Sequence, residues 1–506
     1  MSSNDTTRSG LNRPGTVDPD RDRRMVVLAA AFLASSLICW SSVSLGPKLT
    51  LAIAVVPLVL PFMVAYAAMM ERGILDPTAL FPACFGAYNG LPLIKLLSDD
   101  MPQNRAYPVK FEPYIYFEAG LLSALAAIFI AVTWALWRLP PCKKLRKSDL
   151  MGWFEIGIGS YILGILLYQV EYLEVGGYWA ALAIERTRRF EVMAEKLSLP
   201  YFAFVLVGLV MAAAASDSTR KRVATIVMSG LWCAMVMVQG DRRLLLQAVV
   251  AVLAAWMFVA ARSIRMRTKH LVLAISAYIV LAVAGQLREQ IPRLVSDPDA
   301  RHTVVDSDKN SSLLESVKPG NSELGAPFLS VLYNAEHVRE HALGASYFYT
   351  LVAIFPRFIY PTKPPSPATE MANDLHRGRF LGFAAAGWGY SPVAEAFLNF
   401  GMPGVCIISS LWMGAFIGLS RLRNYTWGLV LAAVLAPETI NANRIDFRTV
   451  YLEAFSCTAA VLIAALLVGI LFHVSSQRVR HRTAKVKVRI PHHPICAPDR
   501  LGDHSL

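Results

Sequence analysis

Long apolar stretches, separated by short polar or cationic segments, follow one another along almost the whole chain. Many of them reach the roughly 20 residues that a helix needs to cross a hydrocarbon core of about 30 Å. About twelve stretches predict transmembrane helices, although the eleventh is short for a full crossing. Their ranges are 25–45, 49–70, 78–97, 114–137, 152–170, 199–216, 224–239, 243–261, 270–287, 393–420, 427–438 and 449–473. The pattern predicts an all-α polytopic membrane protein.

Composition supports this fold class. Of the 506 residues, 55% are hydrophobic and only 17% are charged, which is too apolar for an ordinary soluble domain. The 7 cysteines show neither CxxC nor Cys/His ligand spacing, so neither a disulfide framework nor a zinc site is indicated. Acidic pairs such as Asp99 and Asp100 are common in polar loops. We therefore expect no metal and no other cofactor.

Clusters of Lys and Arg set the expected orientation, because short cytoplasmic loops carry an excess of them. The formal net charge is +13, and with Arg21–Arg24 in the cytoplasm the clusters at 142–147, 219–222, 262–269 and 421–423 and the basic tail fall on the same side. Both termini are then cytoplasmic. The expected organisation is a disordered N-terminus (1–24), nine transmembrane helices (25–287) with an outward loop at 171–198, a large extracytoplasmic loop (288–391), three C-terminal membrane segments (392–473) and a basic cytoplasmic tail (474–506).

Arginine recurs in the outward loops, where the charge rule disfavours it. The segments are ERTRRF (185–190), GDRR (240–243), FPRFIYPTKPP (355–365), LHRGRF (375–380) and NANRIDFR (441–448). A guanidinium presents paired donors to phosphate oxygens and stays charged when it is desolvated. Arginines that converge from these loops would form a diphosphate site.

Each of these cations also has a structural explanation. The arginines of ERTRRF could snorkel or pair with the adjacent glutamates. Asp241 and Arg242 could pair and cap a turn, and Arg357 and Lys363 could be interfacial anchors beside aromatic residues. Arg444 lies in a polar break inside an apolar region, where non-helical backbone is tolerated if it is buried in protein or lines a water-filled cavity. A functional role is favoured there.

The tenth predicted span begins with SPVAEAFLNFG, which places a carboxylate at the outer membrane boundary. Glu395 and Asn399 are four residues apart and therefore share one helical face. A carboxylate at that depth is costly unless it is paired or functional. Glu395 could pair with a loop arginine or act as a general base. His341, Asp374 and His376 are further candidate bases that the sequence does not rank.

The quoted segments together form a known outline. GASYFYTLVAIFPRFIYPTKPP followed by SPVAEAFLNFGMPG resembles the Wzy-type O-antigen and exopolysaccharide repeat-unit polymerases, in which a PR-aromatic-x-P-x-K-P stretch precedes an E-A-aromatic-x-N-F-G helix. GDRR before an apolar span is similar to the family's glycine-x-arginine entry to a helix. The resemblance covers mainly Tyr172–Gly404. Thr362 stands where an acidic residue is expected, so a carboxylate role does not carry over to that position.

The resemblance implies a metal-independent glycosyltransferase with GT-C-like architecture in the bacterial inner membrane. Its implied activity moves a glycan chain from undecaprenyl diphosphate to a hydroxyl of an incoming lipid-linked repeat unit, outside the cytoplasm. The implied partners are undecaprenyl-diphosphate-linked oligosaccharides and membrane lipids, with a chain-length regulator and a flippase as further candidates and no nucleic acid. The alternatives are an O-antigen ligase-like transferase and a transporter of anionic lipid-linked glycans. A transporter should show two matching halves with interrupted spans, and only one interruption is visible, near Asn441.

Under this resemblance the candidate residues fall into three groups. Glu395 is the candidate base, and Arg357 and Arg242 are the candidates for stabilising the departing diphosphate, where each fixed donor contributes about 3 kcal/mol in a dry site. The diphosphate-binding candidates are Arg186, Arg189, Arg243, Lys363 and Arg444. The substrate-binding candidates are Asn399, Tyr347, Phe358 and Tyr360. The proline-rich run is expected to be a stiff rim that holds Arg357 and Lys363 over an outward cavity.

Overall fold

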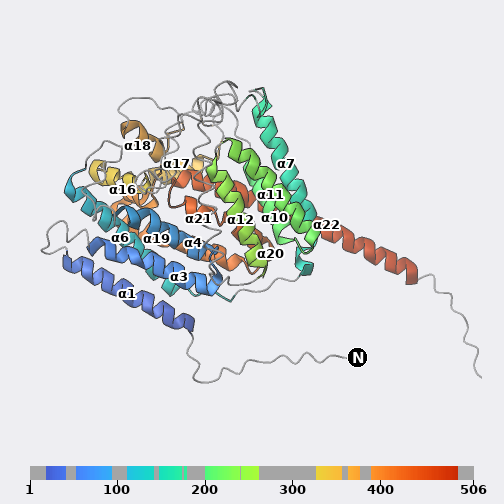
Figure 1. The fold of residues 1–506 in the computed structure, drawn as a ribbon, viewed down its shortest axis with the longest axis horizontal. Coiled ribbons are helices and arrows are strands. Elements are labelled where there is room, and N and C mark those ends of the chain that lie inside the picture. Colours follow the sequence, from blue (N-terminus) through green and yellow to red (C-terminus); the bar gives the residue numbers. More distant parts are fainter. Residues whose placement is uncertain are drawn as a thin grey trace, which may run out of the picture.

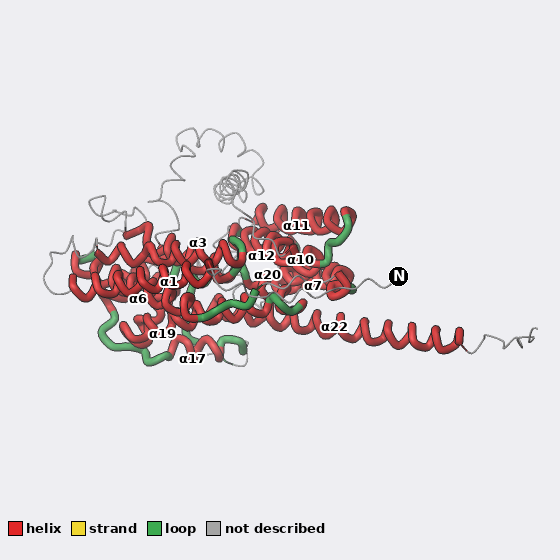
Figure 2. The backbone as a smooth tube through the Cα atoms, turned by 90° about the horizontal axis from the view of Figure 1, so that it is seen from below, coloured by secondary structure: helices red, strands yellow, loops and turns green. Residues whose placement is uncertain are grey.

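The computed structural model describes residues 19–41, 53–93, 111–141, 147–173, 176–178, 180, 200–239, 241–260, 326–355, 360, 363–375 and 389–487. Within these ranges every regular element is a helix (Figures 1 and 2). The predicted ninth span, 270–287, lies outside the described residues, as does part of the predicted outward loop, 181–198.

Seven described helices are long and apolar enough to cross a membrane. They are Ile53–Arg72, Tyr114–Leu136, Trp153–Leu173, Thr219–Gln239, Arg243–Ala260, Pro392–Leu422 and Phe447–Leu471. Their outward faces carry large apolar side chains, including Ile226 with 56% and Leu466 with 65% of its surface exposed. Soluble monomers rarely expose continuous apolar surface of this kind. The chain is therefore a helical, membrane-embedded protein.

One group of helices comes mainly from the N-terminal third of the chain. It comprises α1 (Pro19–Ser41), α3 (Leu60–Arg72) with the preceding 3₁₀ turn η1 (Val56–Val59), α4 (Pro77–Phe85) and α6 (Pro113–Leu136). Helix α6 packs against α1, α3 and the C-terminal helix α19 (Pro392–Leu422), and α16 (Ala326–His337) packs across α6 and α19. The blue and cyan helices of Figure 1 show this group.

A second group is formed by α7 (Trp153–Leu173), α10 (Tyr201–Ala214), α11 (Thr219–Gln239) and α12 (Arg242–Ala260). Helix α10 lies against α7, α11 and α12 and is buried along almost its whole length. Glycines permit the closest approach, because a Cβ on Gly164 would lie 2.6 Å from the Val205 backbone nitrogen and one on Gly208 would lie 2.5 Å from that of Tyr161. Small residues at such crossings allow membrane helices to pack backbone against backbone.

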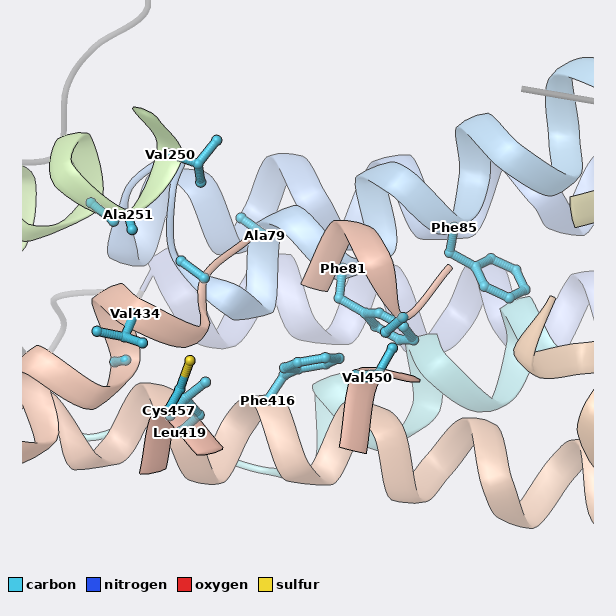
Figure 3. Close-up of a cluster of buried hydrophobic side chains, with 14 of the residues drawn as sticks. Ala79, Phe81, Phe85, Val250, Ala251, Phe416, Leu419, Val434, Val450 and Cys457 are labelled. Carbon is cyan, nitrogen blue, oxygen red and sulfur yellow. The ribbon is translucent and has the colours of Figure 1, made fainter. Parts of the chain in front are cut away.

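The two groups meet through three C-terminal helices. Helix α19 packs on α6 and α4 of the first group and on α20 (Thr426–Leu435), and α20 and α22 (Phe447–Lys487) both pack on α10 of the second group. Figure 3 shows the shared core, where Phe81 of α4, Val250 of α12 and Phe416 of α19 lie with side chains from α20 and α22. The Phe81 and Phe416 rings lie 4.8 Å apart between centroids. Because residues far apart in sequence form this core, the C-terminal helices fix how the two groups are placed.

The helices differ from the expected segments at several boundaries. Helix α1 begins at Pro19, inside the N-terminal segment expected to be disordered, and α22 continues to Lys487, inside the predicted tail. The predicted span 78–97 begins as α4, with Pro82 inside it, and continues as the π-helical turn η2 (Gly86–Gly90). Three short helices, α16, α17 (Ala345–Val352) and α18 (Pro367–Leu375), lie within the predicted loop 288–391. The expected short eleventh span is the ten-residue α20.

Candidate functional site

Helix α19 carries the candidate base on its first turn. Ser391 is the N-cap, with its side-chain oxygen accepting a hydrogen bond from the backbone nitrogen of Val393 (3.2 Å), and Pro392 occupies the first turn without losing a helical bond. Glu395 and Asn399 follow on one face and are both buried, with 1% and 0% of their surface exposed. At Gly401 the backbone turns to a φ of 65°, which kinks the helix directly after this face. The predicted shared face of these two residues is present.

Glu395 connects three helices through its two carboxylate oxygens. Ser346 of α17 donates its hydroxyl to Oε1 (2.9 Å), and the backbone N–H of Phe447, the first residue of α22, donates to Oε2 (2.8 Å). Asn399 donates to the Ser346 hydroxyl (2.8 Å) and accepts from the Ser346 backbone nitrogen (3.3 Å). We refer to Ser346, Glu395, Asn399 and Phe447 as the Glu395 cluster.

The electrostatics of the Glu395 cluster are unusual for a buried carboxylate. No described basic residue forms an ion pair with Glu395, and the hydrogen bonds it accepts come from a hydroxyl and a backbone N–H. The N-terminus of α22 supplies a partial positive charge through its free N–H groups. Asp446, the residue before α22, adds a second carboxylate nearby. The cluster can therefore accept a proton, and one of the two donors to Glu395 is already a hydroxyl group.

The first turn of α22 also contacts the described end of the proline-rich run. Arg448 donates to the backbone oxygen of Pro364 (2.8 Å), which places the segment around Lys363 beside the first turn of α22. Lys363 itself donates to the carbonyl oxygens of Ala353 (2.5 Å) and Phe355 (3.2 Å) at the C-terminal end of α17. These contacts join Lys363 to the C-terminal end of α17.

The polar break before α22 lies against the beginning of α19. Helix α20 ends at Leu435, the short α21 (Glu438–Asn441) follows, and a turn leads to Phe447. The backbone oxygen of Arg444 accepts from the Tyr390 nitrogen (2.9 Å), two residues before α19 begins. Asn443 donates to the backbone oxygen of Phe81 in α4 (3.1 Å). The break is thus buried in protein.

A second network of charged side chains lies further along α22. Arg243 of α12 forms an ion pair with Glu453, and Gln247 donates to both Glu453 (2.9 Å) and Glu438 of α21 (2.6 Å). Asp241 accepts hydrogen bonds from the backbone nitrogens of Arg243 (3.0 Å) and Leu244 (3.2 Å), so it caps α12. Because Glu453 balances the charge of Arg243, this guanidinium also serves to join α12 to α22.

The other described candidate bases, Asp374 and His341, have different neighbours from those of Glu395. The Tyr333 hydroxyl donates to Asp374 (2.5 Å), which joins α16 to α18, and burial together with this bond raises the pKa of Tyr333. The His341 ring packs edge-on against Phe397 of α19 at 5.5 Å. His376 lies outside the described residues. Glu395 is thus the candidate base that joins α17, α19 and α22.

The predicted site residues are only partly described. Arg186, Arg189, Arg357 and Phe358 lie outside the described residues, and the side chain of Arg242 does as well. Glu395, Asn399, Tyr347, Lys363 and Arg444 lie around the beginning of α22, and the Tyr347 ring packs edge-on against Phe447 at 5.1 Å. Arg243 lies at Glu453, further along the same helix. Tyr360 is half-buried.

Several residues of the site were not anticipated from the sequence. Ser346 lacked any signal, because its partner Glu395 is 49 positions away. Asn334 donates to the Tyr390 hydroxyl and to the Ala394 backbone oxygen, both at 2.8 Å, and so fixes the start of α19. Glu453 did carry a signal, since it is an acidic residue inside a predicted apolar span.

Among the described residues no group of three or more His, Cys, Asp or Glu side chains could hold a metal ion. Comparison of the chain with protein-family models, with curated proteins and with solved structures found no match. The functional conclusion therefore depends on the residues and their geometry.

Proposed function

We propose that the chain is a polysaccharide polymerase, a glycosyltransferase that transfers a glycan chain from undecaprenyl diphosphate to a hydroxyl of an incoming lipid-linked repeat unit. One observation carries this proposal. Segments that the sequence singled out separately gather at the first turns of α22, where Glu395, the Lys363–Pro364 segment and the turn after Arg444 meet.

The reaction can be written with the residues of this region. The bond between the anomeric carbon and the diphosphate oxygen breaks, and the leaving diphosphate keeps the electron pair. The acceptor hydroxyl forms the new bond to that carbon and gives its proton to Glu395. An acceptor that replaces the Ser346 hydroxyl as the donor to Oε1 would lie within hydrogen-bond distance of the base.

The proposed role of the arginines is to stabilise the leaving diphosphate. Charge develops on the departing diphosphate, and fixed guanidinium donors lower the barrier when they are aimed at that charge. Arg357 and Arg242 are the proposed principal donors, with Arg444, Lys363, Arg186 and Arg189 in support. Arg243 is the least suited of the candidates because Glu453 already balances its charge.

The proposal includes the wider architecture. It has about twelve spans in a GT-C-like arrangement in the bacterial inner membrane, with both termini in the cytoplasm and the Glu395 cluster on the opposite face. Two features of the described helices support it: seven apolar spans, and an interrupted segment, α20–α21, that leads directly into the site.

Reconstitution tests the proposal. Purified protein in proteoliposomes with an undecaprenyl-diphosphate oligosaccharide should yield longer lipid-linked chains together with free undecaprenyl diphosphate. Arg357→Ala and Arg242→Ala should each abolish elongation while the protein remains folded. Loss in the Arg→Lys variants too would show that paired donors are needed as well as charge.

Three outcomes would contradict the proposal or a part of it. Retained elongation in both alanine variants would remove the arginine assignment. Movement of intact substrate across the bilayer without chain growth would identify a transporter, and transfer to a different acceptor without elongation would identify a ligase-like enzyme.

A further inference from the structure

Helix α17 has two different faces. Its inner face carries Ser346, Tyr347 and Thr350, of which Thr350 is 1% exposed and Ser346 belongs to the Glu395 cluster. Its outer face carries Phe348 and Leu351, with 63% and 53% of their surfaces exposed. An amphipathic helix of this kind usually directs its apolar face into a core, but here the apolar face points away from the protein. Figure 2 shows α17 at the edge of the helical body, beside α19.

Polarity changes abruptly along the exposed chain before α17. The side chains of His337, Arg339, Glu340 and His341 are exposed and polar. Immediately afterwards the exposed side chains become apolar, beginning with Leu343 at 83% and ending, after α17, with Phe355 at 50%. Such a change over a few residues is typical of the boundary between the headgroup layer and the hydrocarbon of a membrane.

The outer face of α17 continues the apolar surface of a spanning helix. Phe400 of α19, 40% exposed, lies beside the beginning of α17, because a Cβ on Gly344, the N-cap of α17, would lie 2.9 Å from its ring, and the ring stacks with Tyr347 at 6.1 Å between centroids. Met402, two residues further along α19, is 42% exposed. Further along α19 the large exposed apolar side chains are Ile407 and Leu411. Since α19 is a candidate membrane span, α17 lies next to a helix whose exposed apolar side chains would themselves meet lipid.

Both ends of α17 have protein partners for their backbone groups. Asn399 accepts a hydrogen bond from the Ser346 nitrogen in the first turn, and Lys363 donates to the carbonyl oxygens of Ala353 and Phe355 just after the helix. In water, solvent satisfies the terminal groups of a helix. In hydrocarbon they must be satisfied internally, because each unsatisfied group costs several kcal/mol.

We infer that α17 is embedded in the bilayer, with Phe348, Leu351 and Phe355 in contact with lipid acyl chains, although the sequence predicts this segment to be part of a large extracytoplasmic loop. The bilayer is the partner of this surface. One helix then separates Ser346 and Glu395 from the lipid phase. If the proposed function holds, a lipid-linked substrate would have its shortest route to Glu395 past α17.

Photo-crosslinking in lipid nanodiscs tests this placement without any assay of activity. A benzophenone amino acid is introduced at Phe348 or Leu351, irradiated in the full-length protein, and adducts with phospholipid acyl chains are counted by mass spectrometry. Leu411, 62% exposed on α19, is the matched lipid-facing control, and the exposed Glu340 is the matched polar control. Elution as a single species in size-exclusion chromatography confirms that each labelled protein is folded.

Adduct yields at 348 and 351 should lie within about twofold of the yield at Leu411 and at least tenfold above that at Glu340. Yields at both positions equal to that of Glu340 would overturn the inference. Agreement at one position alone would also contradict it, because Phe348 and Leu351 lie about one turn apart on the same face. A failed elongation assay would leave this result unaffected, so the two proposals are separately testable.

Discussion

Two buried carboxylates lie near opposite ends of α19 and have different kinds of partner. Asp76, next to the end of the helix, forms an ion pair with Arg423 and accepts a hydrogen bond from Ser420 (2.8 Å). Glu395, on the first turn, accepts hydrogen bonds from neutral donors and pairs with no described cation. Both side chains are about equally buried, at 0% and 1% exposure. The extent of burial therefore does not distinguish the two carboxylates, whereas their ion-pair and hydrogen-bond partners do.

The Asp76 end is a closed structural junction. Asp76 is the N-cap of α4, accepting from the Thr78 backbone nitrogen (2.9 Å), and the Arg423 guanidinium lies 3.7 Å from the centroid of the Phe258 ring of α12. Three helices thus meet on one ion pair. Burial alone would raise the pKa of Asp76, but Arg423 and Thr78 outweigh it and hold that pKa below its usual range. A carboxylate fixed in its charged form can neither take nor give a proton near neutral pH.

Glu395, unlike Asp76, has no described cation that would hold its carboxylate in the charged form. A buried carboxylate without a cation is costly, and such groups in membrane proteins are commonly functional. Under the proposed function, the acceptor hydroxyl takes the place of the Ser346 hydroxyl at Oε1. A carboxylate without a described cation, rather than burial alone, therefore marks the candidate site.

The largest expected effect comes from opening the Asp76 junction. Asp76→Ala leaves Arg423 buried without its partner, which should cost about 3–5 kcal/mol of folding free energy. Thermal unfolding in detergent measures the change. Asp217→Ala is the matched control, because it breaks the exposed Lys221–Asp217 pair (3.3 Å) and should cost no more than about 1 kcal/mol. Equal losses in the two variants would contradict a structural role for Asp76.

Acid should weaken the same junction in a defined direction. The folded-state pKa of Asp76 lies below the unfolded value of about 4, so its stabilisation is present above that pH and is lost as the pH falls through the folded-state pKa. Wild-type protein should therefore show an acid-induced fall in melting temperature that is smaller in Asp76→Ala. An identical pH profile in both proteins would exclude this contribution.

A smaller effect is expected at the kink between the two ends of α19. Gly401 has a φ of 65°, and a Cβ there would lie 2.8 Å from His341 Nε2, so Gly401→Ala should destabilise the protein by about 1–3 kcal/mol. Gly414 is the control on the same helix, because a Cβ there meets nothing within 4 Å. Gly414→Ala should be neutral or stabilise by up to about 1 kcal/mol. A lower melting temperature for Gly414→Ala than for Gly401→Ala would contradict the expected strain at position 401.

The smallest expected change in stability comes from removing a hydrogen-bond donor to Glu395. Ser346→Ala removes the donor to Oε1 and the acceptor for Asn399, which should cost about 1 kcal/mol. Ser410→Ala, which removes only a bond to the Cys406 carbonyl within α19, should be within about 0.5 kcal/mol of wild type. If Ser346→Ala were as neutral as its control, the hydrogen bonds of the Glu395 cluster would contribute little to folding.

Local features of the site followed from the sequence. The spacing of Glu395 and Asn399 predicted their shared face, and the structure confirms it with a hydrogen bond from Asn399 to the Glu395 backbone oxygen (2.8 Å). The capping of α12 by Asp241 was one of the two interpretations considered for GDRR, and it is present. The polar break before α22 was also predicted. Each of these depends on residues within a few positions of one another.

Contacts between distant segments could not be predicted in the same way. Arg423 and Asp76 are 347 positions apart, and Gln247 and Glu453 are 206 apart. Such pairs depend on which helices become neighbours, and apolar periodicity does not specify that. Asp76 did have a local signal, because an aspartate directly before proline is typical of a helix start. Arg423, the partner of Asp76, had no such local signal.

The most direct test of the central claim compares Glu395→Gln with wild type in the reconstituted elongation assay, normalised to folded protein. Glutamine keeps the size of the side chain but cannot accept the proton of an acceptor hydroxyl. Elongation should fall by at least about 100-fold, the lower range for loss of a general base, while the melting temperature changes little. Elongation within a fewfold of wild type would contradict the assignment of Glu395 as the base and, with it, the functional contrast between the two ends of α19.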